Sequence, residues 1–338
     1  MNITKRQCFL NAARHKVTPY IPHYVDPIDE YREMLERETG VMREGLDKWL
    51  GNHVDKFDLS KGEYIEPGVY KDEYGIIWDK RGVSRDVGDI KNSVLPEPDL
   101  SGYELPEVDE EEACLKCEAF FERERNSDSV KFIRFGSMLF ERAWFLRGFE
   151  EFLTDLVLEE RFASELLEKL SDRVMRLVKI ALRYDFDGVY FGDDYGHQRG
   201  LLMSPALWRK VMKPILAPMF QYVREQGRLV AFHSCGDLRT ILGDLCDIGL
   251  DIYQTVQPEI YDLAWLKKEF GKDLTFWGAV STQTELPMLK AGELKPLLRR
   301  KKEILGEGGG FIIAPTHRII MDVPLENFLA MLEVFQER

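Results

Sequence analysis

The sequence predicts an α/β protein, a single (β/α)8 TIM barrel with an N-terminal helical and hairpin elaboration. From residue 131 onward, short apolar segments of strand length alternate with longer segments of helical pattern. Two earlier strand candidates bring the number of strands to eight, which is the number of a closed barrel. Polar side chains follow the C-terminal ends of these strands, where barrel enzymes build their sites.

The N-terminal third has a less regular pattern. Thr4 is the predicted N-cap of a helix over residues 4–15. We expect the whole chain, 1–338, to form one domain, with residues 18–130 as an irregular elaboration within it. The other elements expected here are strands at 21–25 and 54–59, helices at 28–49 and 109–125, and a hairpin at 68–78.

The remaining two-thirds of the chain supply the regular units. The predicted strands are 132–135, 188–192, 229–232, 252–256, 274–280 and 311–314. The predicted helices are 150–184, 204–226, 238–248, 260–270, 293–305 and 324–336, with Ser204 as an N-cap before Pro205. An open doubly wound sheet is the alternative, and it is disfavoured because no G-x-G-x-x-G motif opens a helix.

The composition argues against several classes of partner. Lys and Arg number 46 against 59 Asp and Glu, a net charge of −13, so neither nucleic acid nor an anionic membrane is expected as a partner. No apolar run approaches the roughly 18 residues of a membrane span. The five cysteines are irregularly spaced and the N-terminus does not have the pattern of a secretory signal, so we expect a cytoplasmic protein. A homodimer is left open.

His233 and Cys235 follow one predicted strand, and His317 follows the last one. Because one residue separates His233 from Cys235, both side chains point to the same face of an extended chain. Two imidazoles and a thiolate would suit a catalytic zinc ion with one open position. The alternative interpretation is a core histidine with a buried thiol, and His317 is equally suited to act as a general acid.

A polar run, Asp193-Asp194-Tyr195-Gly-His197, follows another apolar strand. Paired carboxylates at a strand end can share a proton, hold a metal or fix a ligand imidazole, so Asp193 and Asp194 are predicted catalytic residues. Tyr195 and His197 are predicted substrate contacts. The alternative role for the aspartates is helix capping, although Ser204 already serves the helix that follows.

Three further side chains are candidates. Gln257 and Trp277 follow or end later strands and are predicted to line a substrate pocket, although a tryptophan is more often simply part of a core. Glu141 lies among large apolar residues after the third strand. An internal pair with Arg147 is its simplest role, and a carboxylate ligand to the metal is the alternative.

Several ordered motifs from Phe140 to the C-terminus resemble the uroporphyrinogen decarboxylase superfamily, whose fold is a single (β/α)8 barrel. The resemblance covers about the last two-thirds of the chain. It is carried by Phe140-Glu-Arg-Ala-Trp-Phe-Leu-Arg-Gly148, Gly192-Asp-Asp-Tyr-Gly196, Ser204-Pro205, His233-Ser-Cys-Gly236, Trp277-Gly-Ala-Val280, Gly309-Gly-Phe-Ile-Ile-Ala-Pro-Thr-His317 and Asp322-Val-Pro-Leu-Glu-Asn327.

The resemblance implies one of two chemistries. The decarboxylases of the superfamily use no metal and bind a polyanionic tetrapyrrole through an arginine-rich N-terminal motif, whereas this chain has Pro19-Tyr-Ile-Pro-His-Tyr-Val-Asp26 in the corresponding stretch. The corrinoid-dependent methyltransferases bind zinc through an H-x-C pair and a later cysteine. His233 and Cys235 match that pair, and His317 stands in place of the later cysteine.

The methyltransferase branch gives the leading hypothesis. It is a zinc-dependent transfer of a methyl group between a small methylated substrate and the cobalamin of a separate corrinoid protein, since this chain has no D-x-H-x-x-G corrinoid signature. The first alternative is a metal-free decarboxylase with His317 or an aspartate as proton donor. The second is a non-catalytic protein that docks a corrinoid protein.

Overall fold

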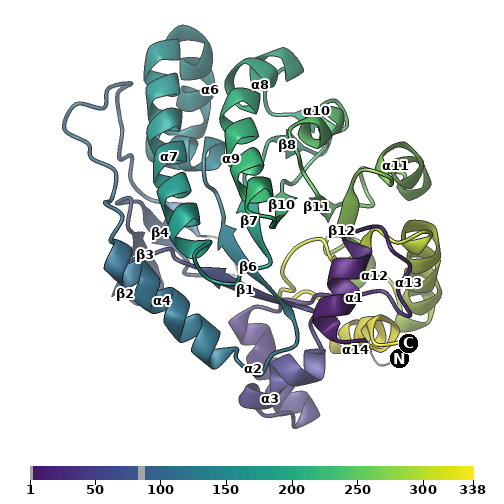
Figure 1. The fold of residues 1–338 in the computed structure, drawn as a ribbon. Coiled ribbons are helices and arrows are strands. Elements are labelled where there is room, and N and C mark those ends of the chain that lie inside the picture. The colour runs from purple at the N-terminus through teal and green to yellow at the C-terminus, as the bar shows by residue number, and fades with distance from the viewer. Residues whose placement is uncertain (1–2, 83–87) are drawn as a thin grey trace.

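Seven parallel strands form most of the barrel wall. The computed structural model describes residues 3–82 and 88–338. Helices surround the sheet on its outer face, which confirms the predicted α/β barrel architecture (Figure 1). In spatial order the strands are β1 (Val54–Asp58), β6 (Val130–Phe135), β7 (Gly188–Gly192), β10 (Leu229–His233), β11 (Ile252–Val256), β12 (Thr275–Val280) and β13 (Phe311–Pro315).

The eighth position of the barrel is filled by an extended segment and not by the full strand predicted at 21–25. His23 forms an isolated parallel bridge with Ile313 of β13, and Pro27 forms another with Ile319. Pro22 and Pro27 have no backbone N–H, so this segment cannot donate a continuous ladder of hydrogen bonds. The prediction of a strand at this place is therefore corrected to two bridges within an extended chain.

On its other side, this segment reaches β1 through a side chain. The Asn52 amide accepts a hydrogen bond from the Val25 N–H at 2.8 Å and donates one to the Val25 carbonyl at 2.8 Å. The backbone N–H of His53 also donates to the carbonyl of His23. The barrel is thus closed between β13 and β1 by a mixture of backbone and side-chain hydrogen bonds.

The helices confirm most of the predicted positions, with differences at the breaks. Thr4 caps α1 in a capping box with Gln7. The helix predicted over 28–49 is broken at Gly40, which has φ 72°. The bounds are α1 (Lys5–Ala12), α2 (Asp29–Thr39), α3 (Arg43–Leu50), α4 (Glu110–Arg123), α5 (Phe140–Arg147), α6 (Phe149–Leu158), α7 (Glu160–Ala181), α8 (Pro205–Val211), α9 (Lys213–Glu225), α10 (Leu242–Asp247), α11 (Leu263–Phe270), α12 (Glu285–Met288), α13 (Ala291–Gly306) and α14 (Leu325–Phe335).

The N-terminal elaboration contains a small antiparallel sheet, and the predicted hairpin is its β3–β4 pair. Arg142 of α5 holds this sheet at Asp72, at 2.7 Å, and Arg173 of α7 holds it at Glu73, at 2.5 Å. Residues 83–87 of the predicted elaboration lie outside the described residues. The remaining short strands are β2 (Gly62–Glu66), β3 (Val69–Asp72), β4 (Ile77–Asp79), β5 (Asp89–Ile90), β8 (Gly196–His197) and β9 (Gly200–Leu201).

Alternate residues of the barrel strands face inward and lie in layers. Near the N-terminal ends the interior is apolar, and Phe9 of α1 packs edge-on against Phe132 and Trp277. Toward the C-terminal ends the strand register places Asp58 beside Arg134, and His233 beside Gln254. The polar layer forms the base of a cavity, whereas the apolar layers below it form the core.

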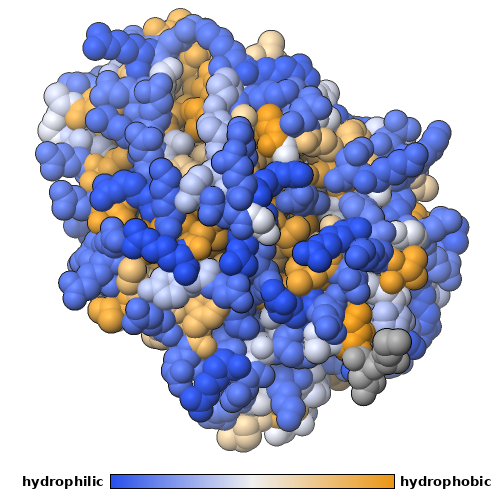
Figure 2. All heavy atoms as spheres, viewed as in Figure 1, coloured by the Kyte–Doolittle hydropathy of each residue, from blue (hydrophilic) through white to orange (hydrophobic). Residues whose placement is uncertain are grey.

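The outer surface contains no candidate for a membrane-crossing element among the described helices, since none is both long and apolar enough to cross a bilayer. The face in Figure 2 is mostly hydrophilic, with apolar side chains scattered between charged ones.

Candidate metal centre and active-site cavity

A cavity of about 570 Å³ opens at the C-terminal ends of the barrel strands. Its volume lies within the range of small-molecule sites. The residues that line it come from many parts of the chain, from residue 24 to residue 318: Tyr24, Asp26, Lys56, Phe57, Asp58, Arg134, Gly136, Ser137, Glu141, Tyr190, Gly192, Asp194, His233, Gln254, Trp277, Pro315, Thr316, His317 and Arg318.

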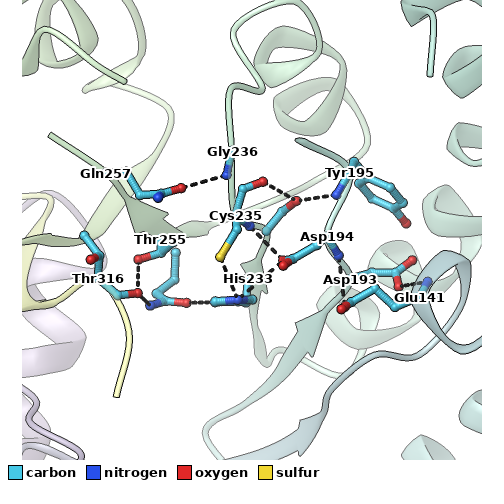
Figure 3. A network of polar contacts seen from close by, with 12 residues as sticks. Glu141, Asp193, Asp194, Tyr195, His233, Cys235, Gly236, Thr255, Gln257 and Thr316 are labelled. Atoms are coloured by element: carbon cyan, nitrogen blue, oxygen red, sulfur yellow. Dashed lines mark hydrogen bonds and ion pairs between the residues drawn. The ribbon is translucent and has the colours of Figure 1, made fainter. Parts of the chain in front are cut away.

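Asp194 and His233, which line this cavity, converge with Cys235, which lies beside them but is not among the lining residues (Figure 3). One ligand-capable atom from each lies within 4.8 Å of the others. The Cys235 Sγ is 3.6 Å from the His233 Nε2, and Asp194 Oδ1 is 3.5 Å from the same nitrogen. The expectation that His233 and Cys235 share a face is met in the folded chain, and Asp194 completes a set of three potential metal ligands.

Gln254 fixes the orientation of the His233 ring. The Gln254 Oε1 is hydrogen-bonded to His233 Nδ1 and also accepts a hydrogen bond from the Tyr190 hydroxyl at 2.6 Å. The Gln254 Nε2 donates a hydrogen bond to the Thr316 carbonyl at 3.3 Å. The amide oxygen, and not the nitrogen, therefore faces His233. Because the Gln254 oxygen accepts a hydrogen bond from His233 Nδ1, the ring proton of the neutral histidine is on Nδ1. The lone pair of Nε2 therefore faces Cys235 and Asp194.

The loop that carries Cys235 is held by backbone hydrogen bonds. The N–H of Cys235 donates to Asp194 Oδ1 at 2.8 Å, and that of Gly236 donates to Gln257 Oε1 at 2.7 Å. Gly236 has φ 88°, and a Cβ there would lie 2.1 Å from the carbonyl carbon of Gly196. Glycine is therefore required at this position, and Gln257, which is buried, positions the loop and does not line the cavity.

His317 and Glu141 lie near the three converging residues but outside the group. The His317 ring centroid is 6.1 Å from that of His233, and the His317 side chain lines the cavity from an exposed position. Glu141 Oε2 accepts a hydrogen bond from the backbone N–H of Asp194 at 3.0 Å. The expected pair between Glu141 and Arg147 is wrong, because Arg147 pairs with Asp155 at 2.8 Å in a buried contact.

Asp193 points away from the cavity and caps helix α5. Its carboxylate accepts hydrogen bonds from the backbone N–H groups of Leu139, Phe140 and Glu141, at 3.4, 2.7 and 2.9 Å. Burial raises the pKa of Asp193 to about 7, although these N–H groups act in the opposite direction. Of the two predicted catalytic aspartates, only Asp194 faces the cavity.

The predicted substrate contacts are divided in the structure. Trp277 lines the cavity, buried between Phe9, Tyr24 and Tyr190. Tyr195 and His197 are not among the lining residues: the Tyr195 ring lies in the core between the sheet and the helices, and His197 is exposed on the short strand β8.

Burial controls the protonation of the converging groups. It raises the pKa of the Cys235 thiol well above its usual range, and the Asp194 and Glu141 carboxylates add to this rise. Burial also raises the pKa of Glu141 well above its usual range, again with a contribution from Asp194. It lowers the pKa of His233, although Asp194 acts in the opposite direction. A bound divalent cation would favour the thiolate and the neutral imidazole, which are the forms that coordinate metals.

The opposite side of the cavity carries charges that the sequence analysis did not identify. Lys56 and Arg318 lie 3.8 and 3.6 Å from the carboxylate of Asp26, and Arg134 lies 3.2 Å from Asp58. Burial opposes ionisation of Asp26, yet Lys56 and Arg318 lower the pKa of its carboxyl overall. The available signal was strongest for Arg134, an arginine within a mostly apolar parallel strand.

Together the fold and the site define a (β/α)8-barrel protein in which a thiol, an imidazole and a carboxylate converge at the C-terminal ends of the strands, next to a cavity. Residues 89–338 match the family model described as "Uroporphyrinogen decarboxylase (URO-D)", and the chain belongs to that family. The resemblance noted in the sequence motifs is thereby confirmed. No curated protein sequence matches the chain.

Two solved structures are similar to this chain to different extents, both at low sequence identity. A methyltransferase from Methanosarcina mazei is similar with a TM-score of 0.74 and 18% identity, covering 99% of this chain and 98% of that chain. A 3-keto-D-glucoside 4-epimerase from E. coli has a TM-score of 0.40 and 14% identity, covering 68% of this chain and 86% of that chain. The first likeness establishes the fold over essentially the whole chain.

Proposed function

We propose that this protein is a zinc-dependent methyltransferase that moves a methyl group between a small methylated substrate and the cobalamin of a separate corrinoid protein. The observation that carries the proposal is the convergence of Asp194, His233 and Cys235 within 4.8 Å at the cavity. A carboxylate, an imidazole and a thiolate are all ligands that zinc takes, and three protein ligands leave a position for substrate.

The surroundings of the three residues fit a metal. His233 presents the lone pair of Nε2 while Gln254 holds Nδ1, an arrangement that is typical of metal-ligating histidines. Asp194 replaces His317 in the ligand set that the sequence alone suggested. His317 faces the same cavity and is a candidate fourth ligand or general acid. Glu141 accepts a hydrogen bond from the backbone N–H of Asp194 and so helps to position it.

The chain's own residues would have distinct roles in the reaction. Bound zinc would supply a Lewis acid at the heteroatom that carries the methyl group. Asp194, His233 and Cys235 hold that position, and Trp277 bounds the space beside it. His317, at the exposed edge, would donate a proton to the heteroatom after the methyl group has left.

Decarboxylation of a polyanionic tetrapyrrole fits this cavity less well. The cationic side chains that line it are Lys56, Arg134 and Arg318, and each lies within 4 Å of an aspartate. Such a cavity has little positive charge to spare for a ligand with many carboxylates. The likeness to the Methanosarcina methyltransferase also favours the methyl-transfer branch of the family.

The experiment is a methyl-transfer assay on the zinc-loaded protein. Reduced free cobalamin stands in for the corrinoid protein, and formation of methylcobalamin is followed by its absorption spectrum with a panel of methylated thiols, ethers and amines. We expect turnover with at least one donor, and loss of turnover in Cys235→Ser and on chelation of the metal. His197→Ala, which changes an exposed histidine outside the cavity, is the control and should retain activity.

Two results would contradict the proposal. One is methyl transfer that is unaffected by chelation and by Cys235→Ser. The other is release of carbon dioxide from uroporphyrinogen by the chelated protein, which would establish the metal-free decarboxylase instead. A protein that only docks a corrinoid partner would give neither reaction.

A further inference from the structure

The Cys235 loop, residues 234–238, lies against one segment of the chain, residues 253–261, which contains most of β11 and the turn that follows it. This segment begins and ends with a tyrosine. Tyr253 and Tyr261 are both buried, and neither lines the cavity. A buried tyrosine hydroxyl needs hydrogen-bond partners, because leaving it without one is costly. The partners here are backbone groups of the Cys235 loop and the two hydroxyls themselves.

The two hydroxyls contact the residues on either side of Cys235. The Tyr253 hydroxyl donates a hydrogen bond to the carbonyl of Ser234 at 3.2 Å. The Tyr261 hydroxyl donates one to the carbonyl of Gly236 at 3.1 Å. The backbone carbonyls that precede and follow the candidate metal-binding thiol are therefore held from the same side of the loop.

The hydroxyls also contact each other, with 3.0 Å between their oxygens. The backbone N–H of Leu238 donates to the Tyr261 oxygen at 2.9 Å. Each hydroxyl has a single proton, so two protons are shared among three contacts, namely the Ser234 carbonyl, the Gly236 carbonyl and the contact between the hydroxyls. Tyr261 supports more of the loop than Tyr253 does, since it also accepts a hydrogen bond from the loop backbone.

The same segment holds the backbone N–H groups of the two neighbours of Cys235. The N–H of Ser234 donates to the carbonyl of Gln254 at 2.8 Å, and that of Gly236 donates to the side chain of Gln257 (Figure 3). Both neighbours thus have their N–H and their carbonyl hydrogen-bonded, and all four partners come from residues 253–261. A fully satisfied hydrogen-bond network of this kind rigidifies the loop and fixes the direction of the side chain that it carries.

We propose that Tyr253 and Tyr261 are positioning residues for the candidate metal centre, which hold the Cys235 thiol in place before a metal binds. They act through the backbone next to the thiol and do not contact the space that a substrate would occupy. The inference rests on the proposed function only for the metal that the thiol takes. The simpler alternative is that the two tyrosines only stabilise the fold, as other buried tyrosines do.

The first measurement uses metal-free protein. Mass spectrometry of peptides follows the rate at which iodoacetamide alkylates Cys235, and it separates this thiol from the other cysteines. In Tyr261→Phe two backbone groups of the loop lose their partner, so we expect alkylation of Cys235 to be about tenfold faster. Tyr253→Phe releases one carbonyl and should accelerate it by about threefold. Tyr253→Phe decides the matter if Tyr261→Phe does not fold.

The second measurement is zinc affinity, determined by competition with a chromophoric chelator. Residues that orient metal ligands contribute about 10–100-fold to metal affinity, so Tyr261→Phe should weaken zinc binding by about tenfold. Cobalt(II) gives a spectroscopic readout, because its charge-transfer absorption arises from the bond between cobalt and the thiolate. At saturating cobalt this absorption should be weaker in Tyr261→Phe than in the wild type.

Tyr31→Phe is the matched control. The Tyr31 hydroxyl is also buried and donates to the carbonyl of Val323 at 3.0 Å, and neither residue lines the cavity. Its removal deletes the same kind of hydrogen bond, so urea unfolding should show a loss of stability similar to that of Tyr253→Phe. The alkylation rate of Cys235 and the zinc affinity should both stay as in the wild type.

The outcomes distinguish this inference from the proposed function. Unchanged alkylation and zinc affinity in Tyr253→Phe and Tyr261→Phe, or equal changes in Tyr31→Phe, would overturn the positioning role and leave the methyltransferase intact. Faster alkylation of Cys235 in the two variants and not in the control, in a protein that binds no zinc, would support the positioning role and remove the proposed function.

Discussion

At the scale of single residues, each candidate ligand of the metal centre is positioned by a hydrogen bond with a neighbouring residue. Gln254 holds His233, Glu141 holds the backbone of Asp194, and Asp194 in turn holds the backbone of Cys235. Fixed partners of this kind orient ligands and lower the cost of binding a metal. The site is therefore organised before any ligand arrives.

The substitution Gln254→Leu tests whether the hydrogen bond with Gln254 orients the His233 ring for metal binding. The substitution leaves Nδ1 without its acceptor, so we expect zinc affinity to fall by about 10–100-fold. Competition with a chromophoric chelator measures this change. Tyr190→Phe, which removes the other donor to the same Gln254 oxygen, is the control and should change zinc affinity much less. Unchanged affinity in Gln254→Leu would show that the ring needs no support from this residue.

Gly236→Ala tests the turn after Cys235. A Cβ at φ 88° is strained and would meet the backbone of Gly196, so urea unfolding should show a loss of about 2–4 kcal/mol. Gly243 lies in helix α10, where a Cβ would have nothing within 4 Å, and Gly243→Ala should stabilise the protein slightly. Equal effects of the two substitutions would contradict the requirement for glycine at residue 236.

The sequence identified some of these residues and not others for a physical reason. His233 and Cys235 are visible because their spacing fixes their relation within one strand end. Gln254 and Arg134 were missed because each is a polar residue in the middle of a mostly apolar strand, with no spacing that marks it as part of a site. Their roles depend on which neighbouring strand lies beside them in register, and that information is not local.

At the scale of elements, most strands and helices follow from local sequence patterns, whereas helix α5 depends on a tertiary contact. Helix α5 was not predicted, and its first N–H groups are satisfied by Asp193, a residue about fifty positions later. A cap that is so distant in sequence leaves no signal at the helix itself. The helix predicted over 204–226 is divided at Met212, shortly before Pro214, a residue that fits the first turn of a new helix.

Asn52→Ala tests the closure of the barrel at the eighth position. The substitution removes both hydrogen bonds to Val25 and leaves a partly buried N–H and carbonyl without partners, so we expect a loss of about 2–3 kcal/mol of unfolding free energy. Thermal unfolding should show a corresponding fall in Tm. Asn126→Ala, at an exposed position, is the control. An unchanged Tm in Asn52→Ala would mean that the segment is held by other contacts.

At the scale of the whole molecule, the barrel interior has an apolar half at the N-terminal ends of the strands and a cavity at their C-terminal ends. The apolar layers and Phe9 fill the N-terminal half of the interior, and the charged residues line the C-terminal mouth. The net charge of −13 gave no indication that Lys56, Arg134 and Arg318 line the cavity, because the composition does not show where the charges lie.

The buried pair of His23 and His53 makes the fold sensitive to acid. Burial lowers the pKa of His23 to about 4 and that of His53 to about 3, below the ordinary 6.5. Their neutral forms stabilise the fold fully above pH 6.5, and stability is lost as the unfolded state gains protons below it. Each histidine should lower the free energy of unfolding by about 1.4 kcal/mol for every pH unit that the pH falls between 6.5 and 4.

Urea unfolding at several pH values measures this dependence. His53→Gln keeps an acceptor for the His23 N–H, and it should reduce the slope of stability against pH by the share of one histidine. The same slope in the wild type and in His53→Gln would assign the acid sensitivity to other groups.

The measurement that tests the central claim most directly is the zinc content of the purified protein, compared among the wild type, His233→Ala, Cys235→Ser and Asp194→Asn. We expect nearly one zinc ion per chain in the wild type, loss in the first two variants, and weakened binding in the third. His197→Ala should retain the metal. A wild-type protein that takes up no zinc even when it is offered, or that keeps it in Cys235→Ser, would contradict the metal centre at Asp194, His233 and Cys235.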